Sequence, residues 1–170
     1  LENIKQIAEY QGYVEKQDTY YGPKEKKQVN AYQDSVFRIR KEKGRQILSF
    51  KNKSFLDKTE VNQENEIDVS SIDKKELELF FDYLGYKSFI DKSKKSHIYI
   101  MRRENQFPVT IEHNNIEPLG EFIEIEILTG DENDAPRARD LIDHIFNEIG
   151  ITETDVENRY YIDLLSGRQK

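Results

Sequence analysis

The residues from Phe122 to Leu128 read FIEIEIL, an alternation of apolar and acidic positions. Successive side chains of a strand point to opposite faces, so the three isoleucines share one face while Glu124 and Glu126 share the other. This stretch therefore predicts a strand with one apolar face and one carboxylate face.

Three other segments, residues 35–41, 46–53 and 62–69, repeat this scheme with charges of one sign on the polar face. The first two segments are basic and the third is acidic. Their charged positions are Arg38 and Arg40, Lys51 and Lys53, and Glu64, Glu66 and Asp68.

Apolar residues at helical spacing predict three amphipathic helices, at Leu1 to Tyr10, Lys74 to Leu84 and Arg137 to Ile149. The hairpin signal Glu42-Lys43-Gly44 separates two of the strands. Strands are expected at Val14 to Tyr21, Ser35 to Lys41, Arg45 to Asn52, Asn62 to Val69, Ser88 to Asp91, His97 to Arg103, Pro108 to His113, Glu121 to Leu128 and Tyr160 to Leu164.

Two arrangements fit this pattern. The simpler one is an antiparallel sheet whose charged face is solvated. The separation of basic from acidic strands, and the three helices that need an apolar surface, favour a closed or nearly closed antiparallel barrel with the helices outside. Charges inside such a barrel must be paired, hydrated or bound to a ligand. Basic strands facing acidic ones would suit a polyphosphate with a divalent metal ion.

Composition and charge narrow the class of protein. A chain of 170 residues most simply forms one domain, residues 1–170. The net charge of -7 argues against a nucleic-acid partner, and no apolar run approaches the roughly 20 residues that a membrane span needs. The absence of cysteine fits a cytoplasmic location. The chain starts at Leu1 and its only methionine is Met101, which predicts that a preceding segment is missing.

Five motifs, taken together and in order, resemble the CYTH family of triphosphate tunnel enzymes, which includes class IV adenylate cyclases and thiamine triphosphatases. The first, QDTYY, resembles the cyclase-like branch in particular. The motifs are QDTYY at 17–21, RIR at 38–40, SFKNK at 49–53, ENE at 64–66 and LGEFIEIE at 119–126. The resemblance implies an α+β fold in which eight antiparallel strands close into a barrel with flanking helices. It also implies that the lumen binds a triphosphate with Mg²⁺ or Mn²⁺.

Matching positions imply the site residues, although no catalytic residue is assigned. The phosphate ligands would be Arg38, Arg40, Lys51, Lys53 and Lys94, and the metal ligands would be Glu64, Glu66, Glu112, Glu124 and Glu126. Three departures stand out: the family's opening ExExK strand is absent, so the domain is expected to lack its first strand, while Ser96 and Asn62 occupy positions where the family often has arginine.

The resemblance implies conversion of ATP to cyclic AMP and pyrophosphate. Hydrolysis of tripolyphosphate or thiamine triphosphate in the same lumen remains an alternative, as does a noncatalytic protein that binds nucleotides or polyphosphate. An interaction domain without a ligand is a further alternative. A homodimer would also be compatible with the apolar surface that such a fold leaves outside.

Overall fold

The computed structural model describes residues 1–30, 34–56, 59–104 and 106–168, without the side chains of residues 51–62, 132 and 168. Four α-helices, two 3-10 helices and seven strands lie in these ranges. In chain order they are α1 Glu2–Ile7, β1 Glu9–Pro23, β2 Phe37–Glu42, β3 Arg45–Leu56, β4 Thr59–Asp68, α2 Lys74–Tyr83, β5 Tyr86–Met101, β6 Val109–Ile116, β7 Gly120–Ile127, η1 Glu132–Asp134, α3 Ala135–Glu148, η2 Glu153–Asp155 and α4 Tyr161–Arg168.

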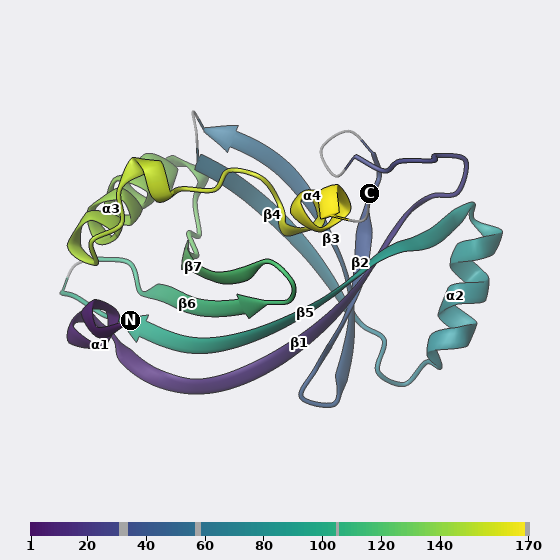
Figure 1. The fold of residues 1–170 in the computed structure, drawn as a ribbon, viewed down its shortest axis with the longest axis horizontal. Coiled ribbons are helices and arrows are strands. Elements are labelled where there is room, and N and C mark those ends of the chain that lie inside the picture. Colours follow the sequence, from purple (N-terminus) through teal and green to yellow (C-terminus); the bar gives the residue numbers. More distant parts are fainter. Residues whose placement is uncertain (31–33, 57–58, 105, 169–170) are drawn as a thin grey trace.

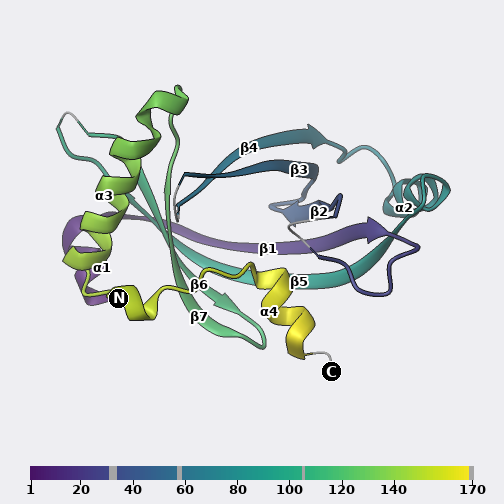
Figure 2. The ribbon, with the colours of Figure 1, turned by 90° about the horizontal axis from the view of Figure 1, so that it is seen from above.

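The strands form one antiparallel sheet in the order β4-β3-β2-β1-β5-β6-β7. Its centre is the pair β1 and β5, of 15 and 16 residues, which runs along most of the molecule (Figure 1). The sheet is strongly twisted and curled (Figure 2). Within the described residues, β4 and β7 are its two edges and do not pair with each other, so the sheet is open.

The prediction of an eight-stranded closed barrel is therefore wrong. Two of the expected strands, Ser88–Asp91 and His97–Arg103, belong to the single strand β5, because the polar stretch between them continues the alternation. In that stretch Lys92, Lys94 and Ser96 are buried while their neighbours are exposed. The expected strand at Tyr160–Leu164 lies mostly in helix α4. An α+β class with flanking helices is correct.

Helices α1 and α3 cover the apolar face of the sheet at one end. The isoleucines of FIEIEIL pack there, as their alternation predicts. The buried residues of this core are Ile4, Tyr99, Met101, Val109, Ile111, Ile145 and Ile149. We call the face that carries this core the outer face of the sheet.

Helix α2 covers the outer face at the other end of the sheet (Figure 1). Its first turn is capped by the Asp73 carboxylate, which accepts a hydrogen bond from the Lys75 backbone N–H at 2.8 Å. Its buried side chains pack on Tyr21 and Ile39, and the Tyr21 ring stacks on Phe37 with centroids 5.3 Å apart. The buried residues of this second core are Tyr21, Ile39, Val69, Leu77 and Phe81.

Helix α4 lies on the opposite face, which we call the inner face. Its Ile162 and Leu165 pack against Ile90 of β5, and the ring of its first residue, Tyr161, meets Phe122 of β7 edge-on at 5.0 Å. One helix therefore covers part of the face that the sequence pattern assigns to charges.

The turn between β2 and β3 is the predicted hairpin. Lys43 and Gly44 both have positive φ, 49° and 77°, as a two-residue hairpin turn requires. Glycine adopts this conformation without steric cost. None of the helices in the described ranges is both long and apolar enough to cross a membrane.

Replacing Ile145 by alanine should destabilise the protein by about 2–5 kcal/mol, because the side chain is completely buried between α3 and the sheet. Urea denaturation measures the change. Leu128→Ala is the control, since Leu128 is 78% exposed and should change the free energy of unfolding by no more than about 0.5 kcal/mol. Equal losses in both variants would contradict this placement of the core.

Candidate functional site

Charged side chains from five strands meet on the inner face of the sheet. They form two adjoining groups, because Asp18 faces Lys92 and Lys16 faces Lys94 in the pairing of β1 with β5. The Asp18 cluster consists of Asp18, Arg38, Arg40 and Lys92. The Lys94 cluster consists of Lys16, Lys94, Glu112 and Glu124.

Asp18 is the centre of the first cluster, and its side chain is 0% exposed. Arg40 donates two hydrogen bonds to it, Nε to Oδ1 at 2.8 Å and Nη2 to Oδ2 at 2.9 Å. Lys92 Nζ lies 3.1 Å from Oδ2, and Arg38 Nη1 lies 3.9 Å from the same oxygen. Three cations from two different strands therefore share one carboxylate, which leaves the cluster with excess positive charge.

The surroundings of Asp18 stabilise its ionised form. Burial alone would raise the pKa of this carboxyl, but the hydrogen bonds from Arg40 and the charges of Lys92, Arg40 and Arg38 hold it well below its ordinary value. Burial likewise opposes the charge of Arg40, and the contact with Asp18 outweighs it and raises the pKa of the guanidinium. The carboxylate and the guanidinium are both charged throughout the physiological range.

Arg38 extends the Asp18 cluster toward the edge strand β4. Its Nε donates to Ser49 Oγ at 2.9 Å, and its Nη2 donates to Glu64 Oε1 at 2.7 Å. Its side chain is 12% exposed and that of Glu64 is 29% exposed. The planar guanidinium is thus fixed by groups on β1, β3 and β4.

Lys94 joins the two carboxylates of the second cluster. Its Nζ lies 2.6 Å from Glu112 Oε2 and 2.9 Å from Glu124 Oε2, and these two glutamates are direct cross-strand partners on β6 and β7. Lys16 Nζ approaches the other oxygen of Glu112 at 2.9 Å. Two ammonium groups and two carboxylates balance, so this cluster is neutral.

The pKa values follow from this pairing. Burial would raise the pKa of Glu112, but Lys94 and Lys16 lower it to about 2. The same competition lowers the pKa of Glu124, chiefly through Lys94. Burial opposes the charge of Lys94, and the two glutamates outweigh that effect and raise its pKa.

Tyr161 of helix α4 contacts the Lys94 cluster on the inner face of the sheet. Its hydroxyl hydrogen-bonds to Glu124, and Lys92 Nζ lies 5.2 Å from the centre of its ring. Burial and the nearby carboxylate raise the pKa of Tyr161, so its hydroxyl stays protonated and donates. Helix α4 thereby contacts both charged clusters.

The structure places five of the predicted site residues within these contacts. They are Arg38, Arg40, Lys94, Glu112 and Glu124, with Glu64 bonded to Arg38. Glu66 and Glu126 lie exposed on the same face, farther along their strands. The side chains of Lys51, Lys53 and Asn62 lie outside the described residues, so their predicted roles remain predictions.

Sequence reasoning missed Lys16, Asp18, Lys92 and Tyr161. Lys16 and Asp18 stand two residues apart on β1, as Lys92 and Lys94 do on β5, and this period of two was the available signal. The pattern was not recognised at Lys92, because residues 92–96 were expected to form a connection between two strands. No local pattern indicates Tyr161, which reaches the site only because α4 folds over the sheet.

Ser96, which occupies an expected arginine position, is completely buried on the inner face. Its Oγ donates to Asn114 Oδ1 at 2.6 Å. A neutral hydrogen bond therefore replaces a cation beside the Lys94 cluster.

The carboxylates of the second cluster suit a divalent ion that arrives with phosphate. Among the described residues, no three histidine, aspartate, glutamate or cysteine side chains are grouped closely enough to hold a metal by themselves. Glu112 and Glu124 nevertheless converge on one cation, the Lys94 ammonium. Mg²⁺ commonly takes one or two protein carboxylates and completes its shell with water and phosphate oxygens, so this donor pair fits such an ion.

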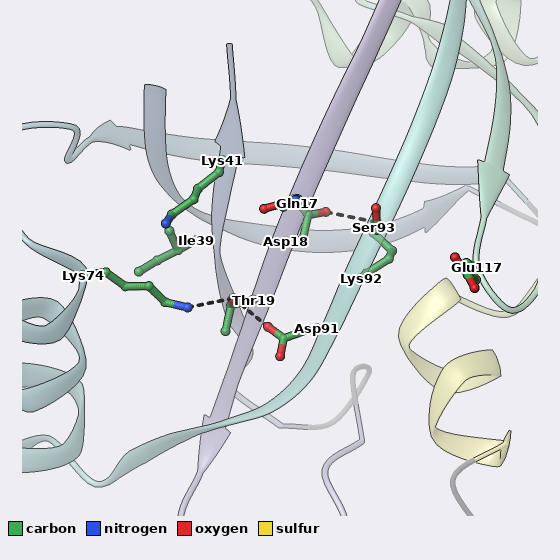
Figure 3. A pocket seen from close by; sticks show the side chains of 10 residues that line it. All are labelled: Gln17, Asp18, Thr19, Ile39, Lys41, Lys74, Asp91, Lys92, Ser93 and Glu117. Carbon is green, nitrogen blue, oxygen red and sulfur yellow. Dashed lines mark hydrogen bonds and ion pairs between the residues drawn. The ribbon is translucent and has the colours of Figure 1, made fainter. Parts of the chain in front are cut away.

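A hollow of about 430 Å³ lies beside α2, and its lining includes Asp18 and Lys92 of the Asp18 cluster (Figure 3). Lys74 of α2 donates to Thr19 at 3.4 Å, and Thr19 donates to Asp91 at 2.7 Å. Thr19 and Asp91 alternate with Asp18 and Lys92 along β1 and β5 and therefore point to the outer face. The hollow therefore adjoins the Asp18 cluster, while the Thr19 and Asp91 side chains belong to the opposite face of the same strands.

Comparisons with known proteins agree on one family. The family model described as CYTH domain matches residues 4–161. A Methanocaldococcus jannaschii protein, provisionally named an adenylate cyclase, is 27% identical over 131 residues, which make up 77% of this chain and 71% of that protein.

Solved structures share the fold. The PH1819 protein of Pyrococcus horikoshii OT3 superposes with a TM-score of 0.80 at 25% identity, over 98% of this chain and 92% of that one. The Hippeastrum protein HpAC1 is a provisionally assigned adenylyl cyclase described as revealing a dominant triphosphatase activity. It superposes with a TM-score of 0.65 at 12% identity, over 98% of this chain and 87% of that one. At 12% identity, the similarity to HpAC1 shows a shared fold and nothing more.

Asp18→Asn should cost about 3–5 kcal/mol of folding stability, because it leaves three buried or half-buried cations without their shared carboxylate. Urea denaturation at neutral pH measures the loss. Asp91→Asn is the matched control: Asp91 is exposed on the outer face and accepts one hydrogen bond from Thr19, so its loss should stay below about 1 kcal/mol. Similar values for both variants would refute the central role of Asp18.

Stability should fall as the pH is lowered from about 4.5 to about 2. The pKa of Glu112 is lower in the folded protein than in the unfolded chain, so the unfolded chain binds more protons in this interval and is favoured as the pH drops. Urea denaturation at a series of pH values measures the slope. Glu112→Gln should give a shallower slope than wild type, and parallel curves would contradict the assignment.

Proposed function

The chain belongs to the CYTH family, and on that basis we propose that its inner face binds ATP through the triphosphate and converts it to cyclic AMP and pyrophosphate. The sequence similarity to a provisionally named adenylate cyclase supports the cyclase reaction over other triphosphate chemistry. QDTYY at 17–21 contributes Asp18 and lies at the centre of the site.

The observation that carries this proposal is the excess of positive charge in the Asp18 cluster. Arg38, Arg40 and Lys92 have side chains only 12%, 16% and 4% exposed, yet these three cations face only two carboxylates, Asp18 and the Glu64 that pairs with Arg38. Desolvating cations beyond what a carboxylate can neutralise is costly. An anionic ligand with several charged oxygens offsets that cost, and a triphosphate is such a ligand.

Each cation has a distinct part in holding the phosphates. The guanidinium groups of Arg38 and Arg40 present paired N–H donors, which match two oxygens of a phosphate. The Lys92 ammonium supplies a point charge between them and Tyr161. Asp18 holds Arg40 in a fixed orientation before the ligand arrives, so less conformational freedom is lost on binding. In the cyclase reaction these cations stabilise the charge of the departing pyrophosphate.

We propose Mg²⁺ or Mn²⁺ as the metal, with Glu112 and Glu124 as its protein ligands. When bound, such an ion would neutralise phosphate charge and make the attacking hydroxyl more acidic. The Lys94 ammonium now bridges the two glutamates, and we propose that it turns to the phosphate oxygens when the metal and the triphosphate bind together.

Two alternatives use the same residues. Hydrolysis of tripolyphosphate or thiamine triphosphate remains open because the cations contact phosphate oxygens, which all these molecules share. Binding without turnover is favoured by Ser96, whose bond to Asn114 stands where a further cation is expected. These outcomes differ only in the product formed.

Phosphorus NMR of the protein with ATP and Mg²⁺ or Mn²⁺, and separately with tripolyphosphate and thiamine triphosphate, distinguishes them. Cyclic AMP with pyrophosphate supports the cyclase, whereas orthophosphate moves the assignment to the hydrolase. No turnover, with ligand resonances that shift or broaden when the protein is added to the ligand and Mg²⁺, indicates a binding protein. Unchanged spectra with every ligand would refute a triphosphate site.

Arg40→Gln should lower kcat/KM about 10²- to 10³-fold, because it removes a fixed donor from developing phosphate charge. Lys41→Gln is the control: it removes a positive charge from the next residue, whose side chain lies on the outer face of the same strand. That variant should retain activity within about twofold. Equal losses would mean that net charge, and not the inner-face contact, sets the rate.

A further inference from the structure

The ring of Tyr161 lies on the inner face of the sheet and reaches from β5 to β7. Its centroid is 5.0 Å from that of Phe122 on β7. Lys92 Nζ, from β5, lies over the same ring at 5.2 Å from the centroid. The strand between them, β6, places Asn114 directly opposite Phe122. One side chain of helix α4 is therefore fixed against side chains of the sheet at several points.

This position brings the hydroxyl of Tyr161 to Glu124. Phe122 and Glu124 stand two residues apart on the same face of β7, roughly 7 Å along the strand. A tyrosine ring packed on Phe122 carries its hydroxyl within reach of Glu124, and the hydroxyl donates a hydrogen bond to that carboxylate. The side-chain amide of Asn114, which Ser96 holds at 2.6 Å, interacts with the phenolic oxygen. The direction of the hydroxyl is thus set from two sides.

Each of the two proposed metal ligands has a second donor besides Lys94. For Glu112 the second donor is the Lys16 ammonium at 2.9 Å, and for Glu124 it is the Tyr161 hydroxyl. In the proposed function Lys94 turns away from both carboxylates when the metal and the triphosphate bind, so only the second donors remain. A phenol orients a carboxylate without adding positive charge. Glu124 therefore keeps its full negative charge for a divalent ion.

We propose that Tyr161 is a positioning residue, which holds the Glu124 carboxylate in the orientation that a divalent metal ion requires. This inference rests on the proposed function, and it gives Tyr161 no contact with the metal or the substrate. Loss of a hydrogen bond to a metal ligand typically costs about 10- to 100-fold in metal affinity. Because Tyr161 belongs to α4, the metal site also depends on the docking of that helix, which Ile162 and Leu165 provide by packing on Ile90.

A purely structural role for Tyr161 leads to a different expectation. If the ring only fastens α4 to the sheet, its contact with Phe122 matters and its hydroxyl does not. Tyr161→Phe keeps the ring and removes the hydroxyl, so it separates the two roles. Tyr20→Phe is the matched control, because the Tyr20 ring also lies near Lys92 Nζ, at 5.6 Å, but belongs to β1, which β5 and β6 separate from β7.

Electron paramagnetic resonance of Mn²⁺ measures metal binding directly and without turnover. Mn²⁺ is titrated into the protein together with α,β-methylene-ATP, whose carbon bridge prevents the cyclase reaction. Tyr161→Phe should raise the Mn²⁺ concentration that half-saturates the protein-bound complex about 10- to 100-fold, whereas Tyr20→Phe should leave it unchanged. The circular dichroism of both variants should match that of the wild type, because each keeps its ring.

The dependence of turnover on metal concentration gives a second measurement. Tyr161→Phe should need more Mn²⁺ than the wild type, and its kcat should recover when Mn²⁺ is saturating, because the hydroxyl acts on metal binding and not on the chemical step. A kcat that stays low at saturating Mn²⁺ would contradict a positioning role.

The outcomes separate this inference from the proposed function. Wild-type protein that binds no Mn²⁺ in the presence of the nucleotide would overturn the proposed metal site, and the role of Tyr161 would fall with it. Equally tight Mn²⁺ binding in the wild type and in Tyr161→Phe would refute the positioning role and leave the metal site standing. Equal losses in the Tyr161 and Tyr20 variants would also refute it, since the effect would then come from the surroundings of Lys92.

Discussion

The charged inner face depends on the buried carboxylate of Asp18. Burial makes its charge costly, and only the contacts with Arg40, Lys92 and Arg38 keep it ionised. The same contacts hold three cations close together in a place where water could not fully solvate them. Because the carboxylates of Asp18 and Glu64 cannot neutralise three cations, the fold keeps a local positive charge in a protein of net charge -7. An anion site in an acidic protein follows from this local imbalance.

The sheet and its helices make that imbalance possible. Alternation along each strand sends apolar side chains to the outer face, where α1, α2 and α3 bury them, and sends charges to the inner face. The long pair β1 and β5 then sets the Asp18 cluster beside the Lys94 cluster, one with excess positive charge and one neutral. In the proposed function the first cluster binds phosphate and the two carboxylates of the second bind the metal, which is how the proposal joins the family membership to the geometry.

Two helices relate this site to the rest of the molecule in different ways. Helix α4 joins it, since Tyr161 contacts Glu124 and lies near Lys92. Helix α2 lies on the outer face of the sheet and exposes Leu79 and Tyr83 to solvent. Substitutions at these two positions leave both charged clusters intact, because neither side chain belongs to a cluster.

Local periodicity was sufficient to predict helices α1, α2 and α3, the hairpin at Lys43-Gly44 and the faces of the strands, since each depends only on residues near one another in sequence. It identified Arg38, Arg40 and Glu124 as inward residues, and family resemblance added Lys94 and Glu112. The tertiary structure determined the ion-pair partners of each of these residues. Cross-strand register placed the Lys94 ammonium between two glutamates and Asp18 among three cations. The continuity of β5, the open edges of the sheet and the position of α4 also depend on long-range pairing and packing, which no local pattern encodes.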